Sequence, residues 1–364
     1  MSVEIKILKQ EDIAELKRLF DKTPILKQHN PFINGSLEEF KWQFFNNKIQ
    51  SAVYAIAYDA ARDELAATLS ALYFPMKSPN GETCQSIKPE DALVNIKALV
   101  RYKDRDLLKE LLEQIVAQTE VLTVKFIWGF TYAVNSFERL GFTNCFSSKQ
   151  GTLVFKPLTA YHHLFGLNTT NRTKQKIQIA GLTMMSYLKN ILSSRNFKEI
   201  TCKEVELNDI DEQTLIRFSA SNLYCIHLNK SFLNWRIIEN PSNLTYSILQ
   251  FEDFSNKILA FFIYSQKVGS VFFVEQFLFS PDLSQLQKEQ ISSNAMHYLK
   301  MKGAAIVRAM GFDHNKVNIH EMNLLKKSGF IFLNRGIPFI FKSLDKHIKP
   351  ENIYLSRLNT EGTY

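Results

Sequence analysis

The sequence has few cysteines, and none of them is placed for a metal site or a disulfide framework. Its 364 residues include four cysteines, which are scattered and form no C-x-x-C pair. Structural zinc sites and small disulfide-rich domains need closely spaced cysteines, or histidines at matching intervals. The histidines at 162–163, 314 and 320 lack acidic or thiol partners at such spacing. We therefore expect no metal to be bound.

A long uninterrupted apolar run is also missing. The most apolar stretch, residues 258–279, is broken by Gln266, Lys267 and Glu275. A membrane-spanning helix needs about 20 predominantly apolar residues, so this stretch predicts paired buried strands instead. The first nine residues alternate charged and apolar side chains, unlike a secretory signal. These features predict a cytoplasmic protein without a membrane span.

Glycine-rich phosphate-binding loops are absent as well. The chain contains no dinucleotide-binding glycine loop, no G-K-S/T sequence and no G-x-S-x-G elbow. Nucleotide hydrolysis and serine hydrolase chemistry therefore have little support in the sequence. What is present is a chain with 45% apolar residues, long enough for two domains of ordinary size with large cores.

Positive charge is concentrated in one segment of a chain whose net charge is +8. Residues 161–199 contain six basic side chains against one acidic side chain, Glu199. This composition suits contact with phosphate or another acidic ligand, and equally a solvated helix face. The apolar residues at helical spacing within it are Ile177, Ala180, Met184, Leu188 and Ile191. Their spacing predicts a basic amphipathic helix that packs across two domains.

An internal repeat organises the rest of the chain. Four anchors recur in the same order in each half, and self-similarity of this kind indicates a duplicated unit. The matched pairs are Phe20 with Phe218, Trp42 with Trp235, Gly141 with Gly329, and Lys156 with Lys342. We expect an N-terminal domain over 1–160, a linker over 161–199, a C-terminal domain over 200–345 and a tail over 346–364. The polar part of the tail after Pro350 is expected to be loosely held.

Strand-like and helix-like patterns alternate within each copy. In the first copy the expected strands cover 52–57, 66–74, 124–128 and 153–156, and the expected helices cover 106–119 and 135–140. Gly141 follows the second helix, where a left-handed residue commonly ends a helix. This order predicts an α/β fold in which helices flank a mixed sheet.

These residues resemble the GNAT superfamily of acyltransferases. Asn135-Ser-Phe-Glu-Arg-Leu-Gly-Phe142 is similar to a late motif of that superfamily, and Pro89-Glu-Asp-Ala-Leu-Val94 resembles the central strand that holds the acyl thioester. The double form, with Trp235-Arg236 and Asn240-Pro241, resembles bacterial tandem GNAT-like proteins associated with surface polysaccharide synthesis. The resemblance covers roughly residues 1–345 and implies two GNAT-like domains in tandem, joined by the basic helix.

One departure from the superfamily concerns the loop that binds the coenzyme A pyrophosphate. The superfamily uses an Arg/Gln-x-x-Gly-x-Gly/Ala turn there, whose backbone N–H groups point at the phosphates. The matching segment here, Tyr102-Lys-Asp-Arg-Asp-Leu107, has Asp104 and Asp106 in place of the glycines. A carboxylate adds like charge beside phosphate, and its side chain obstructs close approach, although Lys103 and Arg105 offer compensating charge. Ser280-Pro-Asp-Leu-Ser284 in the second copy has neither glycine nor arginine, so we expect no ordinary coenzyme A binding there.

The resemblance also implies roles for individual residues in acylating an amine. Glu90 and Asp91 enter the central strand, where the superfamily often places a base, and their alternative reading is a solvated loop. The backbone N–H groups near Leu93 and Val94 would hold the oxyanion.

A tyrosine is the usual acid of the superfamily, but Phe137 occupies the matching position. Tyr132 is the nearest substitute, or simply an aromatic residue beside a strand. Lys103, Arg105 and Asn135 are the expected contacts to acetyl-CoA or another acyl-CoA. Trp42 and Trp235 are expected to be packing anchors rather than substrate platforms.

Three functions are compatible with these features. The leading hypothesis is an N-acyltransferase that moves an acyl group from a thioester to a small-molecule amine, such as an amino sugar. The second is a Fem-type aminoacyl transferase, in which the basic segment 172–198 would contact tRNA phosphates. The third is a catalytically degenerate GNAT-like protein that binds an acidic ligand. Because a fold hosts many functions, the sequence alone leaves all three open.

Overall fold

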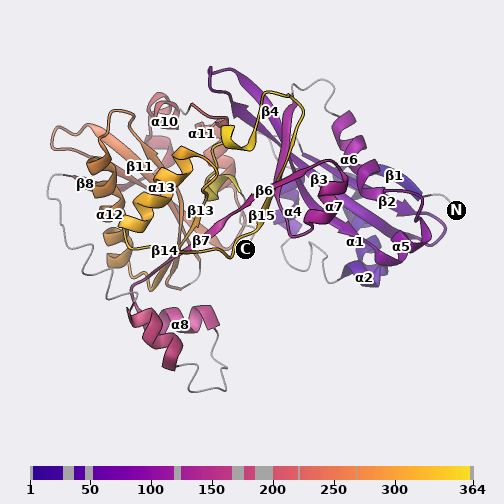
Figure 1. Cartoon of the computed structure of the whole chain (residues 1–364), viewed down its shortest axis with the longest axis horizontal. Coiled ribbons are helices and arrows are strands. Elements are labelled where there is room, and N and C mark those ends of the chain that lie inside the picture. The colour runs from indigo at the N-terminus through magenta and orange to yellow at the C-terminus, as the bar shows by residue number, and fades with distance from the viewer. Residues whose placement is uncertain are drawn as a thin grey trace.

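The computed structural model describes residues 3–27, 37–45, 52–118, 124–165, 176–184, 200–219, 222–267 and 269–360. Within these residues the chain forms two lobes that lie side by side, each built on one sheet (Figure 1). The first sheet contains strands mainly from the N-terminal half and the second contains strands mainly from the C-terminal half.

The first sheet has the strand order β1-β2-β3-β4-β5-β15-β6, with the short strand β9 paired to β3. Its strands are β1 (Val3–Leu8), β2 (Ala52–Asp59), β3 (Glu64–Lys77), β4 (Thr83–Val94), β5 (Val124–Phe130), β6 (Thr143–Ser147), β9 (Cys225–Ile226) and β15 (Pro338–Ser343). Strands β4 and β5 are parallel, and the other pairings in this sheet are antiparallel.

The second sheet repeats this arrangement in the order β8-β10-β11-β12-β13-β7-β14. Its strands are β7 (Lys149–Val154), β8 (Thr201–Val205), β10 (Leu244–Glu252), β11 (Ile258–Lys267), β12 (Val271–Phe279), β13 (Ile306–Gly311) and β14 (Ile331–Leu333). Strands β12 and β13 form its parallel pair, at the place that β4 and β5 occupy in the first sheet. The shared strand order confirms that the two halves are copies of one fold.

The two halves exchange their last strands. Strand β7 belongs to the first half of the sequence but lies between β13 and β14 of the second sheet. Strand β15 belongs to the second half but lies between β5 and β6 of the first sheet. A division of the chain between residues 160 and 200 therefore cuts through both sheets, because each sheet is completed by the other half.

The connections to the exchanged strands cross at Ser148 and Ile337. The Ser148 N–H donates to the Ile337 carbonyl at 3.1 Å, and the Ile337 N–H donates to the Ser148 hydroxyl at 3.0 Å. Gly336 lies directly against this contact, since a Cβ atom there would be 1.6 Å from the Ser148 carbonyl oxygen. Only glycine allows the two connections to approach so closely.

Helices cover the sheets of both lobes. They are α1 (Ile13–Lys22), α2 (Pro24–Lys27), α4 (Leu37–Phe44), α5 (Ile96–Arg101), α6 (Leu107–Ala117), α7 (Val134–Arg139), α8 (Pro157–Phe165), α10 (Glu212–Ser219), α11 (Lys230–Leu233), α12 (Gln285–Met301) and α13 (Lys316–Lys327). Gly141 follows α7 with a φ angle of 83°, which confirms the predicted left-handed helix end, and its repeat counterpart Gly329 follows α13 with a φ angle of 98°. No described helix combines the length and apolar character needed to cross a membrane.

The two faces of the first sheet are packed differently. One face carries small residues such as Ala55, Ala67 and Ala71, against which the apolar side of α6 packs. The other face carries large aromatic residues, including Phe126 and Trp128, in a cluster that continues into residues of the second lobe. The lobes therefore share one hydrophobic core, and burial of this large apolar area holds them together.

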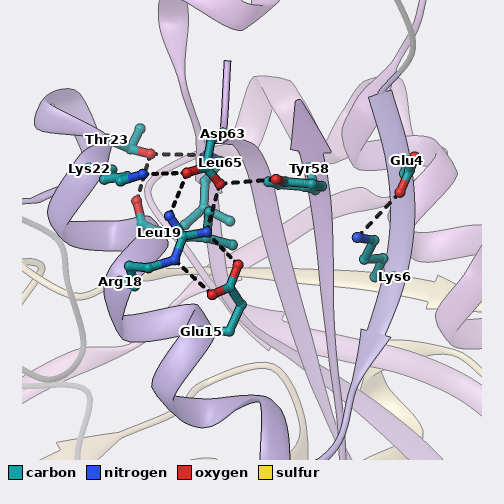
Figure 2. Close-up of polar contacts among 10 residues, drawn as sticks. All are labelled: Glu4, Lys6, Glu15, Arg18, Leu19, Lys22, Thr23, Tyr58, Asp63 and Leu65. Carbon is teal, nitrogen blue, oxygen red and sulfur yellow. Dashed lines mark hydrogen bonds and ion pairs between the residues drawn. The ribbon is translucent and has the colours of Figure 1, made fainter. Parts of the chain in front are cut away.

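Helix α1 is tied to the turn between β2 and β3 by a cluster of charges around Asp63 (Figure 2). Arg18 and Lys22 of α1 form ion pairs with the Asp63 carboxylate, and the Tyr58 hydroxyl donates to it at 3.0 Å. Asp63 adopts a φ angle of 56°, which an aspartate tolerates better than most residues. Hydrogen bonds from Arg18 and Lys22 hold the pKa of this carboxyl well below its usual range.

The linker helix buries a different face from the predicted one. Residues 176–184 are helical, but Ile177 and Met184 are 68% and 64% exposed. Leu182 is the buried residue, and it packs with Tyr161 and Ile306 on the second lobe. The predicted Leu188 and Ile191 lie outside the described residues. The described part of this helix therefore packs on the second lobe, and the predicted packing across both domains is not seen in these residues.

The C-terminal segment is buried, so the prediction of a loosely held tail is wrong. All eight residues from 353 to 360 are buried, and the segment lies between the two lobes (Figure 1). The prediction took polar composition as a sign of exposure. It failed because these polar groups form hydrogen bonds inside the protein. We call residues 353–360 the C-terminal strap.

Candidate functional site

The candidate site begins where the parallel strands β4 and β5 stop pairing. Their ladder runs from Gln85 opposite Val124 to Ile87 opposite Ile127 and does not continue beyond. Two residues later comes Pro89, which has no N–H group to extend a ladder. Among the described residues, the remainder of β4 is therefore paired with β3 alone.

A β-bulge distorts β4 at the same place. Thr68 pairs with Leu93 while Ser70 pairs with Glu90, so two residues of β4, Asp91 and Ala92, lie opposite the single intervening residue of β3. Asp91 has a φ angle of 47°, and its carbonyl accepts a hydrogen bond of 2.8 Å from the Thr68 hydroxyl. Bulges redirect side chains and backbone groups and are common next to active sites.

Two carboxylates, Glu90 and Asp91, lie at this bulge, which is near the end of β4 and not at its entry as expected from the resemblance. Burial, followed by the charge of Glu90, raises the pKa of Asp91 to about 7. Glu90 forms an ion pair with Lys88, whose side chain is almost completely buried. Neighbouring acids with different surroundings can hold and release protons over different pH ranges.

A row of polar side chains crosses the same face of the sheet. Tyr54 on β2 is opposite Ser70 on β3, which in turn is opposite Glu90 on β4. The hydroxyls of Tyr54 and Ser70 are buried and have no partner at hydrogen-bond geometry in the described structure. Burial, and next the charge of Asp91, raises the pKa of Tyr54 well above its ordinary value.

Tyr132 and Asn135 follow the C-terminal end of β5, which is at the same end of the sheet as the C-terminal end of the parallel strand β4. Tyr132 follows β5 in a loop and is 74% exposed, and Asn135 is exposed in the first turn of α7. Phe137, which replaces the usual tyrosine, is buried and packs edge-on against Phe142. Tyr132 and Asn135 thus lie at the same end of the sheet as the β4 bulge, and both are exposed.

Lys103 and Arg105 lie apart from the carboxylates of β4. Arg105 is bonded to Glu110 and donates to the carbonyl of Val3 on β1 at 3.0 Å. Strand β1 is three strands from β4 in the sheet, about 14 Å at the usual strand spacing. Lys103 is exposed in the same turn, and Asp106 caps the N-terminus of α6 by accepting from the Lys109 N–H at 3.2 Å.

The equivalent cleft in the second lobe is occupied by the protein itself. Strands β12 and β13 stop pairing after Phe273 and Arg308, and β12 has a bulge at Glu275. The C-terminal strap lies there, with Arg357 ion-paired to Glu275. The free space beside it is a cavity of about 30 Å³, which has room for water but not for the arm of a thioester.

Comparison with solved structures identifies the architecture. A probable N-acyltransferase from Enterococcus faecalis V583 aligns with a TM-score of 0.59 at 9% identity, over 95% of this chain and 73% of that one. A tandem GNAT protein from the clavulanic acid biosynthesis pathway aligns with a TM-score of 0.54 at 9% identity, over 94% and 98%. The chain has a tandem GNAT fold.

Other GNAT-fold structures are similar to a comparable extent. The N-myristoyltransferase of Saccharomyces cerevisiae, solved with bound myristoyl-CoA, aligns with a TM-score of 0.53 at 12% identity, over 98% of this chain and 84% of that one. No protein-family model and no curated protein sequence matches the chain. At these identities the likeness concerns the fold, whereas function depends on the site.

Four residues of the site were not predicted from the sequence. They are Tyr54, Ser70, Lys88 and Thr360, and the first three share one sheet face with Glu90. Lys88 carried no signal either, because Gln85, Ser86, Glu90 and Asp91 make the centre of this strand polar and a further lysine does not stand out there. The contribution of Thr360 depends on the burial of the strap, which no local pattern indicates.

Proposed function

We propose that the first lobe transfers an acyl group from a thioester to an amine at the bulge of β4. The observation that carries this proposal is the pair Glu90 and Asp91 at a bulge whose strand is unpaired on the β5 side. The corresponding cleft of the second lobe holds the C-terminal strap, which supports a single acyl-transfer site in the first lobe.

Each group at the site has a role in the proposed reaction. Asp91, with a pKa of about 7, removes a proton from the ammonium of the acceptor near neutral pH. The amine nitrogen then attacks the thioester carbonyl, while backbone N–H groups at Leu93 and Val94 stabilise the oxyanion. The carbon–sulfur bond breaks, and the thiolate that leaves receives a proton from Tyr132 or from water.

We propose acetyl-CoA or another acyl-CoA as the donor and a small amine, such as an amino sugar of surface polysaccharide synthesis, as the acceptor. Glu90 and Asp91 together attract a cationic acceptor to the bulge. Asn135 and, in a more extended donor pose, Lys103 and Arg105 are the proposed contacts to coenzyme A. This assignment follows the resemblance of residues 89–94 and 135–142 to the GNAT superfamily.

The experiment is thiol release from acetyl-CoA in the presence of a panel of amines and amino sugars. Asp91→Asn is expected to lower the rate roughly a hundredfold, since it removes the base without changing the size of the side chain. Glu113→Gln, on α6, is the matched control and should leave the rate unchanged. Full activity of Asp91→Asn would contradict the proposal, as would the absence of thiol release with every donor and amine tested.

A second function is favoured by the position of Arg105. The Arg105 guanidinium donates hydrogen bonds to Glu110 and to the Val3 carbonyl. Because these donors are already used, the turn before α6 contributes little to binding a pyrophosphate. The alternative is a donor held elsewhere, such as an aminoacyl-tRNA bound by the basic segment 172–198, of which the structure describes only residues 176–184. Calorimetric titration with acetyl-CoA and with tRNA distinguishes the two, because each donor should bind under only one hypothesis. Binding of neither would favour the degenerate, non-catalytic protein.

A further inference from the structure

The C-terminal strap makes specific contacts with the second lobe. Asn318 of α13 donates to the Leu355 carbonyl at 2.6 Å and accepts from the Leu355 N–H at 3.3 Å. Ser356 donates to Gln276 on β12 at 3.0 Å, and the Arg357 guanidinium is paired with Glu275. These contacts fix the strap by both backbone and side chains, so its path between the lobes is defined.

The strap then reaches the first lobe. Its carbonyl at Leu358 still accepts from a residue of the second repeat, the buried Arg236, at 3.0 Å, whereas its carbonyl at Thr360 accepts from the Lys88 ammonium of the first lobe at 3.1 Å. Lys88 lies on β4, two residues before Glu90. A backbone carbonyl that is anchored in the second lobe thus touches a side chain of the candidate site in the first.

Lys88 has unusual surroundings for a lysine. Its side chain is 1% exposed, and its ammonium lies 6.0 Å from the centre of the Trp128 ring. Transfer of an ammonium group from water into a protein interior is strongly unfavourable unless its charge and its donors are satisfied. The Glu90 carboxylate and the Thr360 carbonyl provide that compensation. If either partner is lost, the charge or a donor of the Lys88 ammonium is no longer compensated, and burial of this side chain becomes unfavourable.

We propose that Lys88 is a positioning residue for acyl transfer, which orients Glu90 and supplies its counter-charge, and that the strap holds Lys88 in place through the Thr360 carbonyl. This inference rests on the proposed function of the first lobe. Under it, Lys88 holds the Glu90 carboxylate at the bulge beside Asp91. The strap accordingly contacts both lobes, since it lies at the bulge of β12 in the second and holds Lys88 of β4 in the first.

The test compares Lys88→Met with Lys88→Arg, using thiol release from acetyl-CoA with the best amine of the panel. Lys88→Met removes the charge but keeps the length of the side chain, so we expect kcat/KM to fall about tenfold or more. We also expect the acidic limb of its pH profile, which reports ionisation of the base Asp91, to move up by about one pH unit, because Glu90 without its counter-charge disfavours a second negative charge on Asp91. Lys88→Arg should retain the wild-type limb.

Two controls separate this role from a structural one. Lys302→Met removes a lysine of the second lobe that is paired with Glu204, and it should leave the profile unchanged. The double variant Lys88→Met/Glu90→Gln should lose no more activity than Glu90→Gln alone, since Lys88 acts through Glu90. Affinity for acetyl-CoA, measured by titration, should stay within twofold of wild type in all variants.

The possible failures are distinguishable. If Asp91→Asn retains full activity, the proposed function of the first lobe is wrong. If Asp91→Asn loses activity while Lys88→Met keeps both its rate and its acidic limb, only the role of Lys88 is wrong. If Lys88→Met does not fold, as seen by circular dichroism, Lys88→Arg and Glu90→Gln still decide. A displaced acidic limb in Lys88→Arg would overturn the proposal, because that variant keeps the charge.

Discussion

Trp42 and Trp235, which are 193 residues apart, stack ring on ring with 4.7 Å between their centroids and 16° between their planes. The Trp42 indole N–H also donates to the Trp235 backbone carbonyl at 3.0 Å. These are matching residues of the two repeats, so the copies meet through the same side chain. The sequence prediction that both are packing anchors is confirmed.

Truncation of one member of this pair should therefore destabilise both lobes. We expect Trp42→Ala to lower the free energy of unfolding by about 3–5 kcal/mol, the range for a buried tryptophan. In a double-mutant cycle with Trp235→Ala, the coupling energy should be about 0.5–1.5 kcal/mol, as for a stacked aromatic pair. Urea unfolding measures both quantities. Phe254→Ala, at an exposed aromatic residue, serves as the control, and a coupling near zero would contradict the stacking.

The crossing of the exchanged strands provides a second prediction. Gly336→Ala would place a Cβ atom 1.6 Å from the Ser148 carbonyl oxygen, so the backbone must move apart there. We expect a loss of about 2–4 kcal/mol in unfolding free energy, typical of a steric conflict in a packed region. Gly181→Ala is the matched control, because its Cβ meets nothing within 4 Å and it lies in a helix. That control should be neutral or slightly stabilising.

The pH dependence of stability should reveal Glu321, which lies beneath the strap. Burial raises the pKa of this carboxyl to about 8, although the Tyr354 hydroxyl that donates to it acts in the opposite direction. The folded protein therefore retains this proton at a pH where the unfolded chain has released it. Its contribution to stability is present below about pH 4.5 and is lost as the pH rises to about 8.

Glu321→Gln should remove this contribution to the pH dependence, since an amide does not titrate. Relative to wild type, the variant should gain stability between pH 5 and pH 9 by urea unfolding. The glutamine oxygen still accepts from Tyr354, so the hydrogen bond is preserved. Glu110→Gln provides a control of opposite sign, because Arg105 lowers the pKa of Glu110. Parallel pH curves for wild type and Glu321→Gln would show that this carboxyl is ionised normally.

The turn before α6 allows a prediction about the donor. From the sequence, replacing Asp104 and Asp106 with glycine removes like charge beside a pyrophosphate and should raise acetyl-CoA affinity about tenfold. In the structure Asp106 caps α6, and its neighbour Arg105 contacts β1. We therefore expect the double variant to bind acetyl-CoA no more than twofold differently and to lose a few tenths of a kcal/mol in stability. A tenfold gain by calorimetry would show that this turn faces the pyrophosphate.

Much of the local structure could be predicted from the sequence. Patterns at 52–57, 66–74 and 124–128 correspond to strands β2, β3 and β5. The helices expected at 106–119 and 135–140 correspond to α6 and α7, within two residues at each end. These predictions succeed because hydrophobic periodicity and helix-end glycines act over a few neighbouring residues. Glu90 and Asp91, in contrast, were expected from the resemblance of residues 89–94 to the GNAT superfamily.

The tertiary structure alone decided which strands complete each sheet. Strands β7 and β15 follow matching positions of the two repeats, so either sheet could accept either strand on pattern alone. Their exchange is determined by the close passage at Ser148 and Gly336, which involves residues far apart in the chain. Local periodicity encodes which face of a strand is buried, but it does not encode which edge the strand joins.

The same distinction applies to the site. The sequence by itself determined the repeat and the α/β class, because these follow from local order and composition, whereas the two carboxylates of β4 were expected from the resemblance to the GNAT superfamily. Only the tertiary structure decided that Lys88 is buried against Glu90, that Arg105 is bonded to Val3, and that the strap is buried between the lobes. Each of those outcomes depends on hydrogen bonds and charge pairs between distant segments, whose energies exist only after the chain has folded.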